Sequence, residues 1–87
     1  MSYEVRVARQ AEAYFRRLDA RTKERIVARL KQIAADPYGP HSKVLTNAGR
    51  QRASRVGDCR IIFSIDSEHS SVDVSVIGPR GRAYRSL

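Results

Sequence analysis

The most apolar stretch of this sequence is Cys59–Ile65, and residues that favour tight turns bound it on both sides. The pair 57–58 (Gly-Asp) precedes it, and the polar run 66–70 follows it. Segment 72–76 has the alternating pattern of a strand, and segment 51–55 is a further candidate strand. Consecutive strands joined by short turns pair antiparallel. The stretch therefore predicts the middle strand of an antiparallel sheet at the C-terminal end of the sequence.

The N-terminal part changes from strand periodicity to helical periodicity. Residues 3–7 alternate between apolar and charged side chains, which predicts a half-buried strand. From about Ala8 the apolar residues follow helical spacing, and Asp19 is expected to break this first helix and to cap a second one. The second helix is expected to end near Asp36, because Pro37 disfavours helical geometry at the residue before it.

Residues 36–49 contain prolines, glycines and an asparagine without any period, which predicts a loop. Val44 and Leu45 are expected to anchor that loop to the core. The predicted order is therefore β-α-α-β-β-β, an α+β fold with a small, mainly antiparallel sheet. Two helices would cover one face of the sheet and leave the other open. The length of 87 residues suits a single domain spanning residues 1–87.

The balance of charge indicates a polyanionic partner. The chain has 17 basic and 9 acidic residues, which gives a net charge of +8. All the basic residues except Lys23, Lys31 and Lys43 are arginine, whose planar guanidinium matches phosphate oxygens. A nucleic acid or an acidic protein is the expected partner. The alternative is a charged surface that serves solubility alone. The sequence contains no run long enough to span a membrane and no signal peptide, so we expect a cytoplasmic protein.

Cysteine and histidine are too scarce for the common metal and disulfide sites. A single cysteine, Cys59, excludes an intramolecular disulfide, and we expect it to be a small buried residue. His41 lies in the predicted loop and His69 in a predicted turn, where both are expected to face solvent. We therefore expect no metal and no cofactor.

Two short segments hold half of the arginines. Residues 50–60 and 80–85 together contain seven arginines and a single acidic residue. Alternation separates Arg60 from the bulky apolar residues of its strand, so it is expected on the open face. If the two segments are neighbours, they form a basic concave surface suited to a phosphate backbone, with Arg52, Arg60 and Arg80 on one face. The candidate RNA-binding residues are Arg50, Arg52, Arg55, Arg82 and Arg85.

Two motifs resemble the RelE/ParE toxin superfamily. Segment 55–66 begins with Arg-Val-Gly-Asp and leads to the arginine that opens a hydrophobic strand, where the family has an arginine-glycine-aspartate-aromatic-arginine run. Segment 76–85 resembles the family's ending, with a glycine, two basic positions and a tyrosine six residues after the glycine. The order of elements and the length match as well. The resemblance covers essentially the whole chain and implies the toxin of a type II toxin–antitoxin system.

The resemblance implies one of two activities. RelE-like toxins enter the ribosomal A site and cut mRNA, and ParE-like toxins poison DNA gyrase. Carried over position by position, the RelE pattern implies Arg60, Arg80 and Tyr84 as catalytic residues, with Arg52 and Arg55 as supporting cations. The chain departs from the pattern at Cys59, which replaces an aromatic residue. It also departs where arginine replaces lysine on the second strand and at Pro79.

The chemistry of RNA cleavage agrees with these roles. The 2′-hydroxyl must attack the adjacent phosphorus, and the protein must stabilise the charge that develops on the phosphate. Arg60 and Arg80 suit that role, and Tyr84 suits proton transfer or base stacking. The sequence offers no evident strong base, which predicts an endoribonuclease that depends on the ribosome. A gyrase inhibitor and a non-catalytic RNA- or protein-binding domain remain alternatives. The expected partners are the ribosome, mRNA and an acidic antitoxin that forms a hetero-oligomer with the toxin.

Overall fold

The computed structural model describes residues 2–45 and 50–79, and their order of elements follows the predicted one with a single addition. The elements are β1 (Glu4–Val7), α1 (Arg9–Arg16), α2 (Ala20–Ala35), β2 (Lys43–Val44), β3 (Arg52–Val56), β4 (Cys59–Asp66) and β5 (Ser71–Pro79). The addition is β2, two residues long, within the segment expected to be a loop. Two residues are too few to show an alternating pattern, so the sequence does not reveal this strand.

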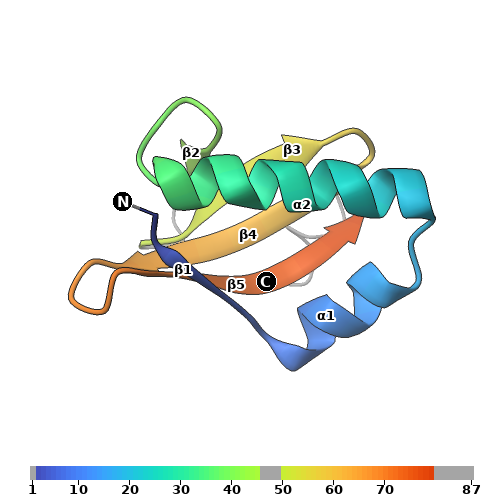
Figure 1. Cartoon of the computed structure of the whole chain (residues 1–87), viewed down its shortest axis with the longest axis horizontal. Coiled ribbons are helices and arrows are strands. Elements are labelled where there is room, and N and C mark those ends of the chain that lie inside the picture. The colour runs from blue at the N-terminus through green and yellow to red at the C-terminus, as the bar shows by residue number, and fades with distance from the viewer. Residues whose placement is uncertain (1, 46–49, 80–87) are drawn as a thin grey trace.

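The strands form one mixed sheet in the order β1-β5-β4-β3-β2. β3, β4 and β5 pair antiparallel through short turns, as expected, and β2 pairs antiparallel with β3. β1 pairs parallel with β5, because the two helices return the chain to the same end of the sheet before the hairpins begin. Figure 1 shows α2 lying across the sheet and α1 beside its lower edge in that view. The predicted α+β fold is confirmed.

The second helix begins and ends where the sequence indicates. Asp19 is the N-cap residue in an extended conformation, and a hydrogen bond from Thr22 lowers the pKa of its carboxyl group. The helix ends at Ala35, two residues before Pro37. Its apolar side buries Ile26 and Ile33 completely. Neither described helix has the combination of length and hydrophobicity that crossing a bilayer would require.

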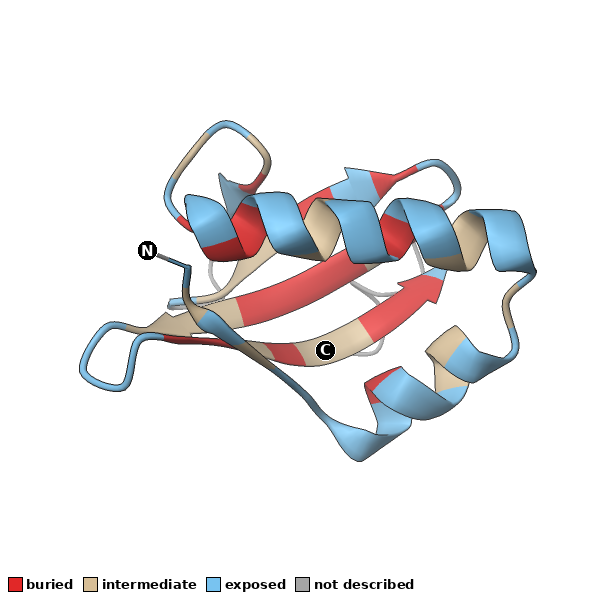
Figure 2. Ribbon diagram, in the orientation of Figure 1, coloured by how far each residue is buried: buried red, intermediate tan, exposed pale blue. Residues whose placement is uncertain are grey.

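The main core lies between the helices and one side of the sheet, which we call the helix face. α1 contributes Ala11 and α2 contributes Ile26 and Ile33, while Ile61 and Phe63 of β4 lie at the centre of the cluster. Figure 2 shows this burial as red segments in β4 and β5 beneath α2. At about 25 cal/mol per Å² of apolar surface, a cluster of this kind supplies most of the stabilisation of a small fold.

The opposite side of the sheet, which we call the far face, carries a second and smaller apolar cluster. Ile62 is fully buried there and clusters with Leu45, and Ala53 and Val76 pack against the pair. The expectation that Leu45 anchors its segment is confirmed. The same expectation for Val44 is wrong, because this side chain is 62% exposed on the edge strand β2. The far face is therefore partly apolar rather than wholly open.

Candidate nucleic-acid interface

Arg60 lies on the far face, as predicted. It stands in β4 between Cys59 and Ile61, both of which belong to the core on the helix face. Successive residues of a strand point to opposite faces, so Arg60 points away from the helices. Its cross-strand neighbours are Arg55 in β3 and Gly78 in β5. The far face therefore carries two adjacent arginines next to a position without a side chain.

The turn between β3 and β4 brings the two arginines together. Gly57 and Asp58 form a two-residue connection, and Gly57 adopts a positive φ of 57° that glycine tolerates without strain. A connection of this length pairs Val56 with Cys59 and hence Arg55 with Arg60. Arg55 is exposed and Arg60 is half-buried. The register of β3 and β4 therefore places Arg55 and Arg60 side by side on the far face.

Arg52 does not belong to this surface, and the prediction that it shares a face with Arg60 is wrong. It pairs with Phe63, a core residue of the helix face, so its side chain leaves the sheet on the helix side. There its Nε donates a hydrogen bond of 2.8 Å to the Ser42 hydroxyl. Its guanidinium lies 5.8 Å from the centroid of the Tyr38 ring. Arg52 therefore fastens the segment before β2 to the sheet.

The remaining predicted site residues flank the described strands or lie beyond them. Arg50 is exposed and lies in a turn two residues before β3. The predicted residues Arg80, Arg82, Tyr84 and Arg85 lie outside the described part of the chain. β5 ends at Pro79, one residue after Gly78, which is the partner of Arg60 in the sheet.

A cavity of about 540 Å³ surrounds the edge of β3. The described residues that line it come from α2, from the segment 40–45, from β3 and from Arg60 in β4. Four of them are arginine or lysine residues, and none of the described lining residues is acidic. These four are Arg29, Lys43, Arg55 and Arg60. A concave surface lined by charges of one sign concentrates ions of the opposite sign, so the cavity is suited to phosphate groups.

Arg29 connects the helix layer to this cavity. One of its terminal nitrogens, Nη1, donates to the Ser54 hydroxyl at 2.8 Å and to the backbone carbonyl of Arg55 at 2.9 Å. The buried Ser54 hydroxyl in turn donates to the carbonyl oxygen of His41. This chain of hydrogen bonds joins α2, β3 and the segment before β2. It fixes the backbone that presents Arg55.

Sequence reasoning missed three of the residues that line the cavity. Arg29 follows Ile26 by one helical turn and so borders the buried stripe of α2, which is a signal that the sequence contains. His41 and Lys43 have no such signal, because the segment 36–49 shows no period. Lys43 pairs with Ala53, whose cross-strand partner on the other side is Ile62, so Lys43 lies on the same face as Arg60. The structure thus adds Arg29, His41 and Lys43 to the predicted arginines.

Cys59 occupies the position where the resembled family has an aromatic residue, and it is buried, as expected. Burial raises the pKa of its thiol, and the nearby Asp58 carboxylate raises it further. Burial also raises the pKa of the Tyr14 hydroxyl, and the neighbouring Cys59 raises it further. Cys59 therefore fills space in the core of the helix face rather than the far face.

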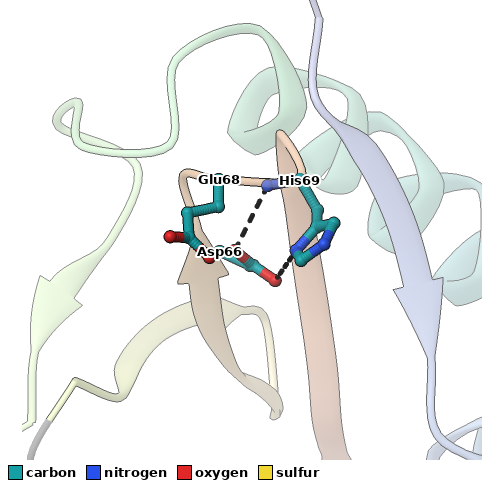
Figure 3. Close-up of side chains that lie close together, drawn as sticks. All are labelled: Asp66, Glu68 and His69. Atoms are coloured by element: carbon teal, nitrogen blue, oxygen red, sulfur yellow. Dashed lines mark hydrogen bonds and ion pairs between the residues drawn. The ribbon is translucent and has the colours of Figure 1, made fainter.

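A second cluster of polar residues lies in the turn between β4 and β5. Asp66, Glu68 and His69 have ligand-type atoms within 4.8 Å of one another. Figure 3 shows that Asp66 accepts a hydrogen bond from the His69 backbone and shares one of 2.7 Å with the His69 ring. The hydrogen bond to His69 lowers the pKa of Asp66. These contacts stabilise an exposed turn, and they account for the cluster without a ligand.

The chain matches one family model and several solved structures. The family model described as "ParE toxin of type II toxin-antitoxin system, parDE" matches residues 5–84. A search of curated proteins gave no match.

Three solved structures illustrate the similarity of fold. A chain of the RelBE2 toxin–antitoxin complex from Mycobacterium tuberculosis is 23% identical with a TM-score of 0.81, over 92% of this chain and 93% of that one. A chain of the archaeal RelE–RelB complex from Pyrococcus horikoshii OT3 is 23% identical with a TM-score of 0.80, over 94% and 99%. A mutant of the E. coli toxin RelE in its free state is 17% identical with a TM-score of 0.82, over 97% and 90%.

Proposed function

The chain belongs to the family of ParE toxins of type II toxin–antitoxin systems, and we propose that it acts by cutting mRNA on the ribosome. The observation that carries this proposal is the pairing of Arg55 with Arg60 on the far face, within a cavity whose described lining has no acidic residue. RNA is a polyanion whose cleavage creates additional negative charge at one phosphate. Adjacent guanidinium groups are suited to bind that phosphate and to stabilise its transition state.

The proposed reaction is a transesterification within the RNA. The 2′-oxygen forms a bond to the adjacent phosphorus, the bond between phosphorus and the 5′-oxygen breaks, and the proton lost by the 2′-hydroxyl is balanced by one gained at the 5′-oxygen. The products are a 2′,3′-cyclic phosphate and a 5′-hydroxyl. Arg60 binds the phosphate together with Arg55, and Arg80 and Tyr84 are proposed to complete the site. The ribosome supplies the bent conformation of mRNA that in-line attack requires.

The proposed partners follow from the same surface. An acidic antitoxin would neutralise the net charge of +8 and cover the arginine pair. The similar structures include complexes of RelE-type toxins with RelB-type antitoxins, which supports a cognate antitoxin in a hetero-oligomer for this chain too. The proposed target, mRNA on ribosomes, corresponds to a cytoplasmic protein without a membrane partner.

Inhibition of DNA gyrase is a second candidate function, and one position favours it. Ala53 stands on the far face next to Ile62 and brings no charge to that face. Together with Leu45 and Val76 it forms an apolar patch that suits a protein surface. A toxin that acts by binding gyrase needs such a patch and does not need the arginine pair for chemistry.

The two functions give different signals in bacteria that express the toxin under induction. We expect incorporation of labelled amino acids to stop within minutes while an SOS reporter stays silent, and we expect R60A and R80A to restore growth. The loss of one transition-state donor typically costs about 100- to 1,000-fold in rate. An SOS response with normal early protein synthesis contradicts the nuclease and supports the gyrase inhibitor. Y84F distinguishes a hydroxyl that transfers a proton from a ring that only stacks.

A further inference from the structure

His41 belongs to the segment between α2 and β2, and it lines the cavity that contains the arginine pair. It lines the same space as Arg55 and Arg60 and is half-buried there. The next residue, Ser42, turns its hydroxyl to the helix face, where it accepts the hydrogen bond from Arg52. The backbone of His41 is also held in place, because its carbonyl oxygen accepts a hydrogen bond from the Ser54 hydroxyl. The backbone of His41 is therefore fixed at the wall of the cavity.

Apart from His41, the described residues that line the cavity offer no side chain suited to accept a proton at neutral pH. The side chains of arginine and lysine are hydrogen-bond donors only, and none of the described lining residues is a carboxylate. Histidine is the side chain whose charge ordinarily changes between about pH 5 and 8, which makes it the most common general base in enzymes. Of the described residues that line the cavity, His41 is the one histidine.

We infer that His41 is the general base of the proposed RNA cleavage. Its neutral imidazole takes the proton of the 2′-hydroxyl as the 2′-oxygen attacks the phosphorus. The imidazolium then returns a proton, through water, to the 5′-oxygen as the bond between phosphorus and that oxygen breaks. The arginine pair meanwhile holds the phosphate on which charge develops. This role rests on the proposed function, because it requires RNA as the substrate.

The surroundings of His41 agree with that role. Charged groups face the cavity from every element around it: Arg29 from α2, Lys43 from β2, Arg55 from β3 and Arg60 from β4. They are suited to bind phosphate, and a scissile phosphate held among them would lie within the same space as the imidazole. The volume of about 540 Å³ is also within the range of roughly 300–1,000 Å³ that is usual for sites that hold small molecules or single nucleotide units.

The chain offers a matched control for this residue. His69 is the other histidine of the sequence, and it lies in the exposed β4–β5 turn, hydrogen-bonded to Asp66. H41A keeps the backbone carbonyl that Ser54 requires, so the variant retains that hydrogen bond. Thermal unfolding of both variants verifies that they fold. H41A and H69A then differ in whether the imidazole that is removed lies in the cavity.

The test measures single-turnover cleavage of mRNA bound to purified ribosomes, from pH 5 to pH 8. We expect H41A to be slower by about 100-fold or more, because general base catalysis contributes at least that much in typical cases. We expect the rate of the wild-type protein to rise with pH over this range and that of H41A to lose this rise. Added imidazole is expected to restore part of the H41A rate, which a merely structural role would not allow. H69A is expected to cleave like the wild type.

Two other outcomes would overturn the inference, and they can be told apart. A wild-type protein that cuts mRNA while H41A cuts at the same rate, with the same dependence on pH, removes the role of His41 and leaves the proposed function intact. A folded wild-type protein that leaves ribosome-bound mRNA uncut at every pH removes the proposed function and this role together.

Discussion

Arg52 and Arg55 differ by three positions in the sequence and lie on opposite faces of the sheet, so they should fail in different ways when replaced. Arg52 is bound to Ser42 and lies over Tyr38 on the helix face, whereas Arg55 is exposed next to Arg60. We expect R52A to lower the free energy of unfolding by about 1 kcal/mol. We expect R55A to change it by less than about 0.5 kcal/mol, as exposed substitutions usually do.

For RNA binding we expect the opposite, with a larger effect of R55A than of R52A. When a protein binds one phosphate fewer in a single-stranded RNA, the log–log slope of affinity against salt concentration decreases by about 0.7. R55A is expected to show that decrease, and R52A is expected to keep the slope of the wild type. The measurement is fluorescence anisotropy of labelled RNA at several salt concentrations. An R52A variant that is fully stable but has the smaller slope would place Arg52 in the interface and contradict the register of β3.

The thiol of Cys59 is expected to be inert in the folded protein. Burial and the Asp58 carboxylate raise its pKa, so at pH 8 less of it is thiolate than in an exposed cysteine, and only the thiolate is alkylated. Labelling by iodoacetamide, followed by mass spectrometry, should be at least about tenfold slower in the folded than in the denatured protein, because reaction awaits opening of the core. Equal rates would show that Cys59 is accessible and that the core on the helix face does not exclude solvent.

At the scale of elements, Arg29 is the residue that ties α2 to the strand edge. Replacing it by alanine removes two hydrogen bonds, to the buried Ser54 and to the Arg55 carbonyl. We expect R29A to lower the free energy of unfolding by about 1–2 kcal/mol, with partial recovery in R29K. Arg21, an exposed residue of the same helix, serves as the control. Chemical denaturation gives the values, and an R29A variant as stable as R21A would contradict the structural role.

The elements that the sequence predicts are those whose pattern repeats several times. The apolar run of β4 and the apolar stripe of α2 each extend over several residues, so both elements have the expected position and type. β2 could not be found, because two residues carry no period. The parallel pairing of β1 with β5 also depends on contacts between residues about 67 positions apart, as in Glu4 with Ser71. No local pattern encodes such a contact.

The candidate site could be predicted only in part, because the pairing of strands and the path of the segment 36–45 decide which side chains meet. The two-residue turn at Gly57 and Asp58 is visible in the sequence, and it implies that Arg55 opposes Arg60. Alternation alone does not decide which face of the sheet Arg52 occupies, and the face predicted for it is wrong. His41 enters the cavity through a segment whose path is fixed by Ser42 and Ser54, which are contacts of the folded state. No spacing in the sequence indicates them.

For the whole molecule, the net charge of +8 should govern how the toxin meets its antitoxin. Attraction between opposite charges speeds association, and salt screens it over a Debye length of about 10 Å at 0.1 M. We expect the protein encoded next to this chain to be acidic and to copurify with it on co-expression. We expect their association rate to fall steeply as NaCl increases, measured by stopped-flow fluorescence. A neighbouring product that does not bind, or a rate that is insensitive to salt, would contradict this account of inhibition.

The central claim is that this molecule cuts mRNA within the ribosome by using its arginine pair. The most direct measurement maps the ends of mRNA after purified toxin is added to ribosomes paused at a defined codon, with R60A and free mRNA in parallel. The account predicts one cut at the A-site codon, a 2′,3′-cyclic phosphate and a 5′-hydroxyl at the new ends, and no comparable cut by R60A or in free mRNA. Intact mRNA on toxin-treated ribosomes, or equal cutting by R60A, would contradict it.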